Sequence, residues 1–259
     1  MLLADIANMR ANSGVPGELR GTEYLHTHYG KLSWSTVIAP AIHLARYGFT
    51  VTQDLVRYMD SATSESNFLV DDPNWAIDFA PNGTRVGLND TITRKRYADT
   101  LEAISQHGAD AFYTGAIANA TIQALQAANG TMTLDDLANY SVVIRKPSRI
   151  TYRDYRLTSG SAPSSGEVGL SVMKAVEGYQ GFGEEALLNL STHRLDEAIR
   201  FGYGQRSNLG DPLFVPGLDE YQAEMVNETT AARTRSLISD VATLNVSDYT
   251  PSGLIGIDE

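Results

Sequence analysis

Two serines in a short turn come closest to a catalytic motif. The stretch Gly160-Ser-Ala-Pro-Ser-Ser-Gly166 joins a predicted strand to a predicted helix and carries hydroxyls at Ser164 and Ser165. A hydrolase with a nucleophile elbow needs Gly-x-Ser-x-Gly at such a junction, and the spacing here differs. A serine in this place more often caps the next helix, and a glycine lets two backbones approach closely. We therefore expect Ser164 or Ser165 to cap a helix and Gly166 to permit close packing.

The histidines and glycines do not form a metal or nucleotide motif. His26 and His28 are two residues apart, which is the wrong period for one face of a helix. His193 and Glu197 are four apart on a predicted helix, but a zinc protease motif needs a second histidine there. Neither glycine-rich phosphate-binding motif occurs. We expect no metal site and no nucleotide site.

Composition excludes several classes of protein. The 259 residues include 20 Lys and Arg against 31 Asp and Glu, a formal net charge of −11. Nucleic acids and anionic membranes attract basic surfaces, so neither is an expected partner. There is no cysteine, which excludes disulfides, thiolate metal sites and a cysteine nucleophile. No apolar run reaches the eighteen or more residues that a transmembrane helix needs.

Asparagine is used in an unusual way. Eight of the 13 asparagines begin an Asn-X-Ser/Thr sequon, whereas 42 serines and threonines placed at random would give about two. The sequons begin at Asn82, Asn89, Asn119, Asn129, Asn139, Asn189, Asn227 and Asn245. They predict a glycoprotein of the secretory pathway, secreted, vacuolar, or anchored by a segment preceding this chain. Residues 1–10 do not resemble a signal peptide, so we expect the chain to be a truncated piece of a longer protein.

Hydrophobic periodicity and turn residues predict a mostly helical chain with a few strands. The expected helices cover residues 18–29, 33–47 (with a kink or a new start at Pro40), 53–62, 94–106, 109–128, 133–140, 167–179 and 192–208, with one or two more within 221–238. A hairpin over 148–159 should turn at Arg153-Asp154. Residues 63–92 should be irregular, with a short hairpin near 84–88. No repeat or linker is visible, so residues 1–259 are interpreted as a single domain.

Seven stretches, in order, resemble the large subunit of γ-glutamyltranspeptidases, also called glutathione hydrolases. The resemblance covers nearly all of residues 14–250, and no single stretch would suffice alone. The stretches are Gly14-Val-Pro-Gly-Glu-Leu-Arg-Gly21, Tyr29-Gly-Lys-Leu-Ser-Trp34 continuing into 40–49, Gly108-Ala-Asp-Ala-Phe-Tyr-Thr-Gly115, Thr133-Leu-Asp-Asp-Leu-Ala-Asn-Tyr140, Tyr152-Arg-Asp-Tyr155 with 161–166, His193-Arg-Leu-Asp-Glu-Ala198 continuing to Tyr203, and Arg206-Ser-Asn-Leu-Gly-Asp-Pro212.

The resemblance implies the mostly helical part of an N-terminal-nucleophile hydrolase, an αββα sandwich with a few strands. Such a precursor cuts itself before a threonine, which then begins a small subunit and attacks γ-glutamyl amides such as glutathione. The threonine's own α-amine can act as the base. The γ-glutamyl group passes to water or to an acceptor amino acid or peptide. The implied partner is the small subunit, and no cofactor is implied.

The chain departs from the family at both ends. The nucleophile should stand in Thr-Thr-His or Thr-Ser-His after the large-subunit tail, and the chain ends at Glu259, about where that motif would begin. Ser191-Thr192-His193 is a lookalike within helical periodicity and is rejected. Arg10 is too close to Val15 to match the family's substrate-carboxylate arginine. We therefore predict no catalytic residue in this chain and no activity from it alone.

The turn could still form part of a pocket wall, through Pro163, Ser164, Ser165 and Gly166. Two other functions stay open. One is a non-enzymatic acidic glycoprotein or binding module derived from a degenerate transpeptidase half. The other is a serine hydrolase whose turn serines are served by His193 with Asp196 or Glu197, although residues so close in sequence give no independent geometric support.

Overall fold

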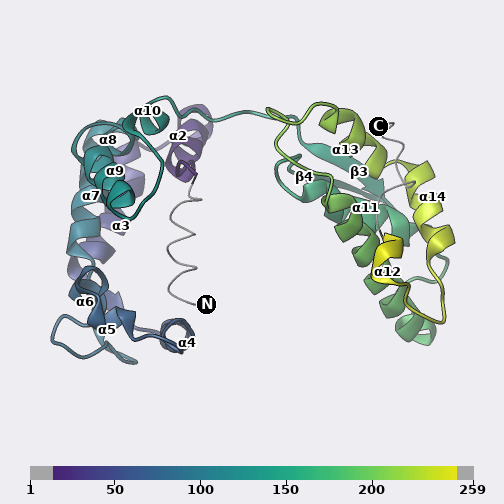
Figure 1. The fold of residues 1–259 in the computed structure, drawn as a ribbon, viewed down its shortest axis with the longest axis horizontal. Helices are drawn as coiled ribbons and strands as arrows, with labels where there is room; N and C mark the ends of the chain where they lie inside the picture. Colours follow the sequence, from purple (N-terminus) through teal and green to yellow (C-terminus); the bar gives the residue numbers. More distant parts are fainter. Residues whose placement is uncertain (1–13, 250–259) are drawn as a thin grey trace. The chain divides into compact units, whose positions relative to one another are not determined.

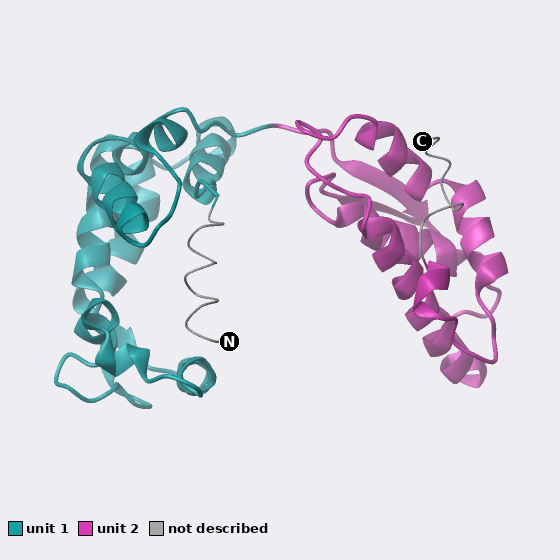
Figure 2. Cartoon of the chain, viewed as in Figure 1, with its two compact units in different colours: residues 1–143 teal, residues 144–259 magenta. Residues whose placement is uncertain are grey.

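The computed structural model describes residues 14–249, and Arg10 and Glu259 lie outside them. The chain divides by its internal contacts into two compact units, residues 1–143 and residues 144–259, coloured separately in Figure 2. Each unit is described by itself. Whether residues 1–259 fold as a single domain stays a prediction, because a division by contacts does not measure cooperative folding.

From residue 14 to residue 143, the first unit consists of helices and one short strand pair, joined by turns (Figure 1). Its helices are α2 (Glu18–Tyr29), α3 (Trp34–Tyr47), α4 (Gln53–Ala62), α5 (Phe68–Asp71), α6 (Pro73–Phe79), α7 (Lys95–His107), α8 (Asp110–Tyr113), α9 (Gly115–Ala127) and α10 (Leu134–Ala138). Strand β1 (Phe49–Thr50) pairs antiparallel with β2 (Thr91–Ile92). Helices α3 and α7 pack against each other.

Side-chain caps explain where several predicted helices begin. The hydroxyl of Ser33 accepts from the amide of Thr36 at the start of α3, and Thr52 caps α4 in the same way. Thr133 and Asp136 form a capping box at α10, which leaves two fewer helix-end amides unpaired. The predicted starts of these three helices are confirmed. Helix α3 runs from residue 34 to residue 47 through Pro40, so the alternative of a second piece starting there is wrong.

Two predictions for this unit are wrong. The helix expected over 109–128 is divided into α8 and α9, because Thr114 is extended and Gly115 has a φ of +71°. In 63–92, α5 and α6 replace the expected irregular stretch, and no strand forms at 84–88. There, Val86 packs into a core cluster with Val51 and Ile92. The strand in this region is instead β2, at residues 91–92. It pairs with β1, which lies more than forty residues earlier in the sequence.

Three of the family-like stretches meet at Tyr113, which is completely buried. Its hydroxyl donates to the carbonyl of Pro16 at 2.6 Å and accepts from the amide of Arg20 at 3.2 Å. The Arg20 guanidinium lies 4.4 Å from the centre of the Tyr113 ring and pairs with Asp110. Tyr140 stacks on Tyr113, with 6.0 Å between ring centres. These stretches therefore build one local core.

The described residues of the second unit form a hairpin and helices that pack on one central helix, α11 (Figure 1). Strand β3 (Ser148–Tyr152) pairs antiparallel with β4 (Tyr155–Ser159), and Arg153 in the turn has a φ of +50°. The helices are α11 (Gly166–Glu177), α12 (Leu188–Arg206), α13 (Leu218–Met225) and α14 (Glu228–Leu237), with short 3-10 turns η1 (Glu185–Leu187) and η2 (Val246–Tyr249). Helix α11 contacts both strands and the helices α12, α13 and α14.

The predicted hairpin and the mostly helical character are confirmed. Helix α12 begins at Leu188, four residues before the predicted start, and the region 221–238 contains two helices. In the part of the chain that the structure describes, no helix is long and apolar enough to cross a membrane.

The hydroxyl of Tyr113 generates a stability prediction. Replacing Tyr113 by Phe leaves a carbonyl and an amide without their partner, so the free energy of unfolding should fall by about 2 kcal/mol. Urea denaturation followed by circular dichroism would measure it. Tyr58→Phe is the matched control, because that side chain is 64% exposed, and it should change stability by less than about 0.5 kcal/mol. Equal effects of the two substitutions would contradict the assigned role of Tyr113.

Candidate functional site

The serine turn lies between β4 and α11, as predicted, but its serines do not cap the helix. Ser165 occupies the N-cap position with φ −91° and ψ 26°, and its side chain makes no capping hydrogen bond. A capping side chain needs an extended backbone to reach the amides of the first turn. The Ser165 hydroxyl instead accepts from Nε of Arg206 at 3.0 Å. The capping prediction is therefore wrong, and Ser165 connects α11 to the end of α12.

Gly166 does permit the close approach that was predicted. A Cβ atom on Gly166 would lie 2.9 Å from Cβ of Ser159, and closer still to the Ser159 hydroxyl and the carbonyl of Gly160. Real Cβ atoms do not approach other atoms at such distances, so a side chain here would push β4 and α11 apart. Gly166 therefore sets how tightly the hairpin and the helix pack.

His193, the predicted base for the turn serines, has another partner. Nε2 of His193 lies 2.7 Å from the carbonyl oxygen of Ser239, which fixes the ring elsewhere. Arg206, the partner of Ser165, is thirteen residues further along α12, which is about 20 Å along the helix axis. Because a triad needs hydrogen-bond contact between serine and histidine, this geometry argues against the serine hydrolase.

The acids next to His193 also have other partners. Asp196 accepts from Nε of Arg200 at 2.8 Å, and Glu197 is buried against the Tyr249 hydroxyl. Nε2 of His26 lies 2.8 Å from a backbone carbonyl oxygen, and so does Nδ1 of His28. Within residues 14–249, no three potential ligands gather in a way that could hold a metal ion.

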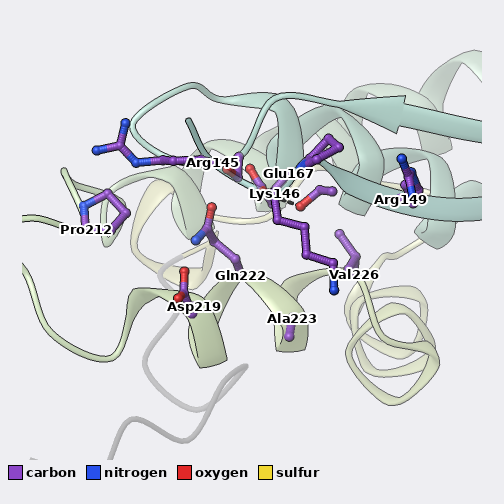
Figure 3. A pocket seen from close by; sticks show the side chains of 12 residues that line it. Arg145, Lys146, Arg149, Glu167, Pro212, Asp219, Gln222, Ala223 and Val226 are labelled. Atoms are coloured by element: carbon purple, nitrogen blue, oxygen red, sulfur yellow. Dashed lines mark hydrogen bonds between the residues drawn. The ribbon is translucent and has the colours of Figure 1, made fainter. Parts of the chain in front are cut away.

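A cavity of about 850 Å³ lies between the start of β3 and helix α13 (Figure 3). Arg145, Lys146 and Arg149 line it on the hairpin side, and Asp219 and Gln222 line it from α13. The Arg145 guanidinium lies 2.8 Å from Asp211. For Lys146 and Arg149 no ion pair is found among the described residues. Three basic side chains and two acidic ones, Asp219 and Glu167, therefore line this cavity.

Glu167 is the functional candidate that sequence reasoning missed. Its side chain is completely buried at the cavity wall, and the Ser148 hydroxyl donates to Oε1 (Figure 3). In the part of the chain that the structure describes, Oε2 has no hydrogen-bond partner. The helix dipole favours an acid in the first turn of any helix. Glu167 therefore looked like an ordinary helix-start residue in the sequence. A buried, half-paired carboxylate is costly, which sets Glu167 apart from an ordinary surface acid.

Of the four predicted pocket-wall residues, Gly166 lines a hollow, and residues next to the turn line the large cavity. Ser161 and Glu167, on either side of the turn, line the large cavity. Gly166 lines a second hollow of about 490 Å³ together with Val168 and Met173 of α11. That Pro163, Ser164, Ser165 and Gly166 form the wall of a substrate pocket stays a prediction. All eight sequon asparagines are exposed, as glycan attachment would require.

The glycine contact can be tested with two substitutions in one helix. Gly166→Ala should lower the free energy of unfolding by about 2 kcal/mol or more, because its Cβ has no room. Gly169→Ala is the control, since a Cβ there meets nothing within 4 Å and alanine favours the helix by about 0.5–1 kcal/mol. Thermal denaturation would measure both, and a neutral Gly166→Ala would contradict the close packing.

Known proteins match this chain over most of its length. It is 55% identical over 242 residues to a glutathione hydrolase proenzyme of Arthroderma benhamiae, covering 93% of this chain and 41% of that protein. A glutathione hydrolase of Aspergillus flavus is 50% identical over 244 residues, with the same coverages. The chain thus spans about two fifths of these relatives.

Solved structures agree with this match. The γ-glutamyltranspeptidase of Helicobacter pylori has a TM-score of 0.82 at 29% identity, over 92% of this chain and 67% of that one. The γ-glutamyltranspeptidase of Pseudomonas nitroreducens has a TM-score of 0.81 at 28% identity, and the match covers 93% of this chain and 70% of that one. The chain therefore has the fold of the mostly helical part of N-terminal-nucleophile hydrolases, as the resemblance implied. The family model described as gamma-glutamyltranspeptidase matches residues 6–255, so the chain belongs to the gamma-glutamyltranspeptidase family.

Proposed function

We propose that this chain is the large-subunit portion of a γ-glutamyltransferase, or glutathione hydrolase. The complete enzyme would cleave γ-glutamyl amides such as glutathione and transfer the γ-glutamyl group to water or to an acceptor amino acid or peptide. The observation that carries this proposal is the 55% identity to a glutathione hydrolase proenzyme over 93% of the chain. No metal or other cofactor is part of the proposal.

In this proposal the chain is a scaffold, and the nucleophile is the threonine that begins the small subunit. That threonine would use its own α-amine as base, which activates an otherwise weak hydroxyl nucleophile. His193 contacts the Ser239 carbonyl and Ser165 accepts from Arg206, which supports a scaffolding role for this chain. The large subunit would contribute packed helices and a pocket wall near the turn.

The small subunit is the proposed partner, and exposed apolar side chains of the second unit support it. After α12, Leu213 is 62% exposed and Phe214 is 83% exposed. Neighbouring Val215 is 41% exposed. Contiguous apolar surface of this kind is typical of a protein interface. We propose that the small subunit covers part of this surface in the complete enzyme.

The activity proposal is tested by comparing the chain with its complete precursor. Residues 1–259 alone should release no product from a chromogenic γ-glutamyl anilide, whereas the complete precursor should cleave itself and turn the substrate over. Turnover by residues 1–259 that is lost in Ser164→Ala or Ser165→Ala would overturn the proposal. A complete precursor that neither cleaves itself nor turns over would favour the non-enzymatic glycoprotein instead.

Glycosylation in the secretory pathway is a separate prediction. When the complete precursor is secreted from a eukaryotic host, peptide mass mapping before and after endoglycosidase treatment should find glycans on the exposed sequon asparagines. Asn67 and Asn208 are matched controls, since neither begins a sequon, and both should stay unmodified. Export without any glycan would contradict the prediction.

A further inference from the structure

The large cavity of the second unit brings side chains of opposite charge together. The basic side chains Arg145, Lys146 and Arg149 come from the segment that leads into β3, whereas Asp219 comes from α13 and Glu167 from α11. All residues that line the cavity belong to residues 144–259, so one unit builds the whole site. Its volume of about 850 Å³ lies within the range of about 300 to 1,000 Å³ that is usual for small-molecule sites.

Two of the basic side chains are available to a ligand. Lys146 and Arg149 are exposed, and neither makes an ion pair with a residue that the structure describes. Arg145 differs from them, because its guanidinium lies 2.8 Å from the carboxylate of Asp211. Figure 3 shows the Lys146 side chain extending from the hairpin side toward α13. The cavity therefore offers two unpaired positive charges.

Two carboxylates of the same cavity are also incompletely paired. Asp219 is exposed and makes no ion pair within residues 14–249. Glu167 is completely buried, and only Oε1 receives a hydrogen bond, from the Ser148 hydroxyl; Oε2 has no partner among the described residues. A buried carboxylate that is not fully compensated attracts a cation strongly, because little water screens it. The cavity therefore also offers two negative charges.

Gln222 fixes the wall that bears one of these carboxylates. Its Oε1 accepts from the amide of Ala162 in the serine turn, and its Nε2 donates to the carbonyl of Leu218 at 3.0 Å. Gln222 is buried and follows Asp219 by three residues, so the two side chains share a face of α13. Helix α13 is thus held against the turn that precedes α11. A wall fixed before binding lowers the entropy that a ligand must lose.

We propose that the large cavity binds a short peptide with free termini, in its zwitterionic form. The peptide carboxylate pairs with Lys146 and Arg149, and Asp219 and Glu167 attract its ammonium group. A purely anionic ligand would be repelled by the two carboxylates, and a purely cationic one by the two basic side chains. A single amino acid would fill only a small part of the cavity. The site would exist whatever reaction the complete enzyme catalyses, because the second unit supplies all of its residues.

The charge requirement is tested by calorimetric titration of residues 1–259 with three peptides, after circular dichroism has shown that the chain is folded. Alanylalanine should bind saturably. N-acetyl-alanylalanine lacks the ammonium group and alanylalanine amide lacks the carboxylate. Each should bind about tenfold or more weakly, because one set of charge-assisted hydrogen bonds is lost. Equal affinities of the three peptides, or no saturable binding of alanylalanine to the folded chain, would overturn the proposal.

Single substitutions locate the binding site. Lys146→Gln and Asp219→Asn should each weaken alanylalanine binding about threefold or more, since each peptide terminus keeps its second partner. Arg233→Gln and Glu220→Gln are the matched controls, because both residues are exposed in the same unit and neither lines the cavity. Both controls should bind like the wild type. Unchanged affinity in both Lys146→Gln and Asp219→Asn would place the peptide elsewhere and overturn the proposal.

The complete precursor provides a second measurement with the small subunit present. The same substitutions should weaken alanylalanine binding there by similar factors, and this comparison decides the question if residues 1–259 do not fold alone. A precursor in which neither Lys146→Gln nor Asp219→Asn changes peptide affinity would show that no peptide occupies the cavity, and would overturn the proposal. Because binding is measured as heat and not as turnover, an inactive precursor would contradict the proposed function without affecting this result.

Discussion

Close packing of α11 is the constraint on which the second unit depends. This helix contacts the hairpin and all three other helices of the unit, so its position sets theirs. It can approach β4 because residue 166 has no side chain, and its C-terminal half contributes Val172, Ala175 and Val176 to a buried cluster with Ala198 of α12. The serine turn and the cavity beside Glu167 both follow from the place where this helix begins.

The first unit depends on a single buried tyrosine in a comparable way. Tyr113 joins the segment at Pro16 and Arg20 to α8, and Tyr140 stacks on its ring. These residues belong to three family-like stretches that are far apart in the sequence. Their spacing along the chain reflects shared packing rather than shared chemistry, which agrees with a chain proposed to act as scaffold.

Two buried carboxylates show how differently the fold treats the same chemical group. Glu197 contacts a tyrosine hydroxyl with both of its oxygens, while Glu167 receives one hydroxyl and leaves Oε2 unpaired among the described residues. A buried charge persists only where the surroundings compensate for lost water. For Glu197 the compensation comes from the Tyr249 hydroxyl, and this contact connects η2 to α12.

The sequence by itself determined the family, the mostly helical composition, the hairpin and most helix boundaries. Each of these depends on local signals: capping residues at Ser33, Thr52 and Thr133, periodic apolar residues, and motifs in a fixed order. The tertiary structure alone decided that Ser165 binds Arg206 instead of capping α11, that Val86 joins a core cluster, and that Glu167 and Glu197 are buried. Those outcomes depend on partners that lie roughly 20 to 50 residues away in the sequence, and a local pattern carries no information about such partners.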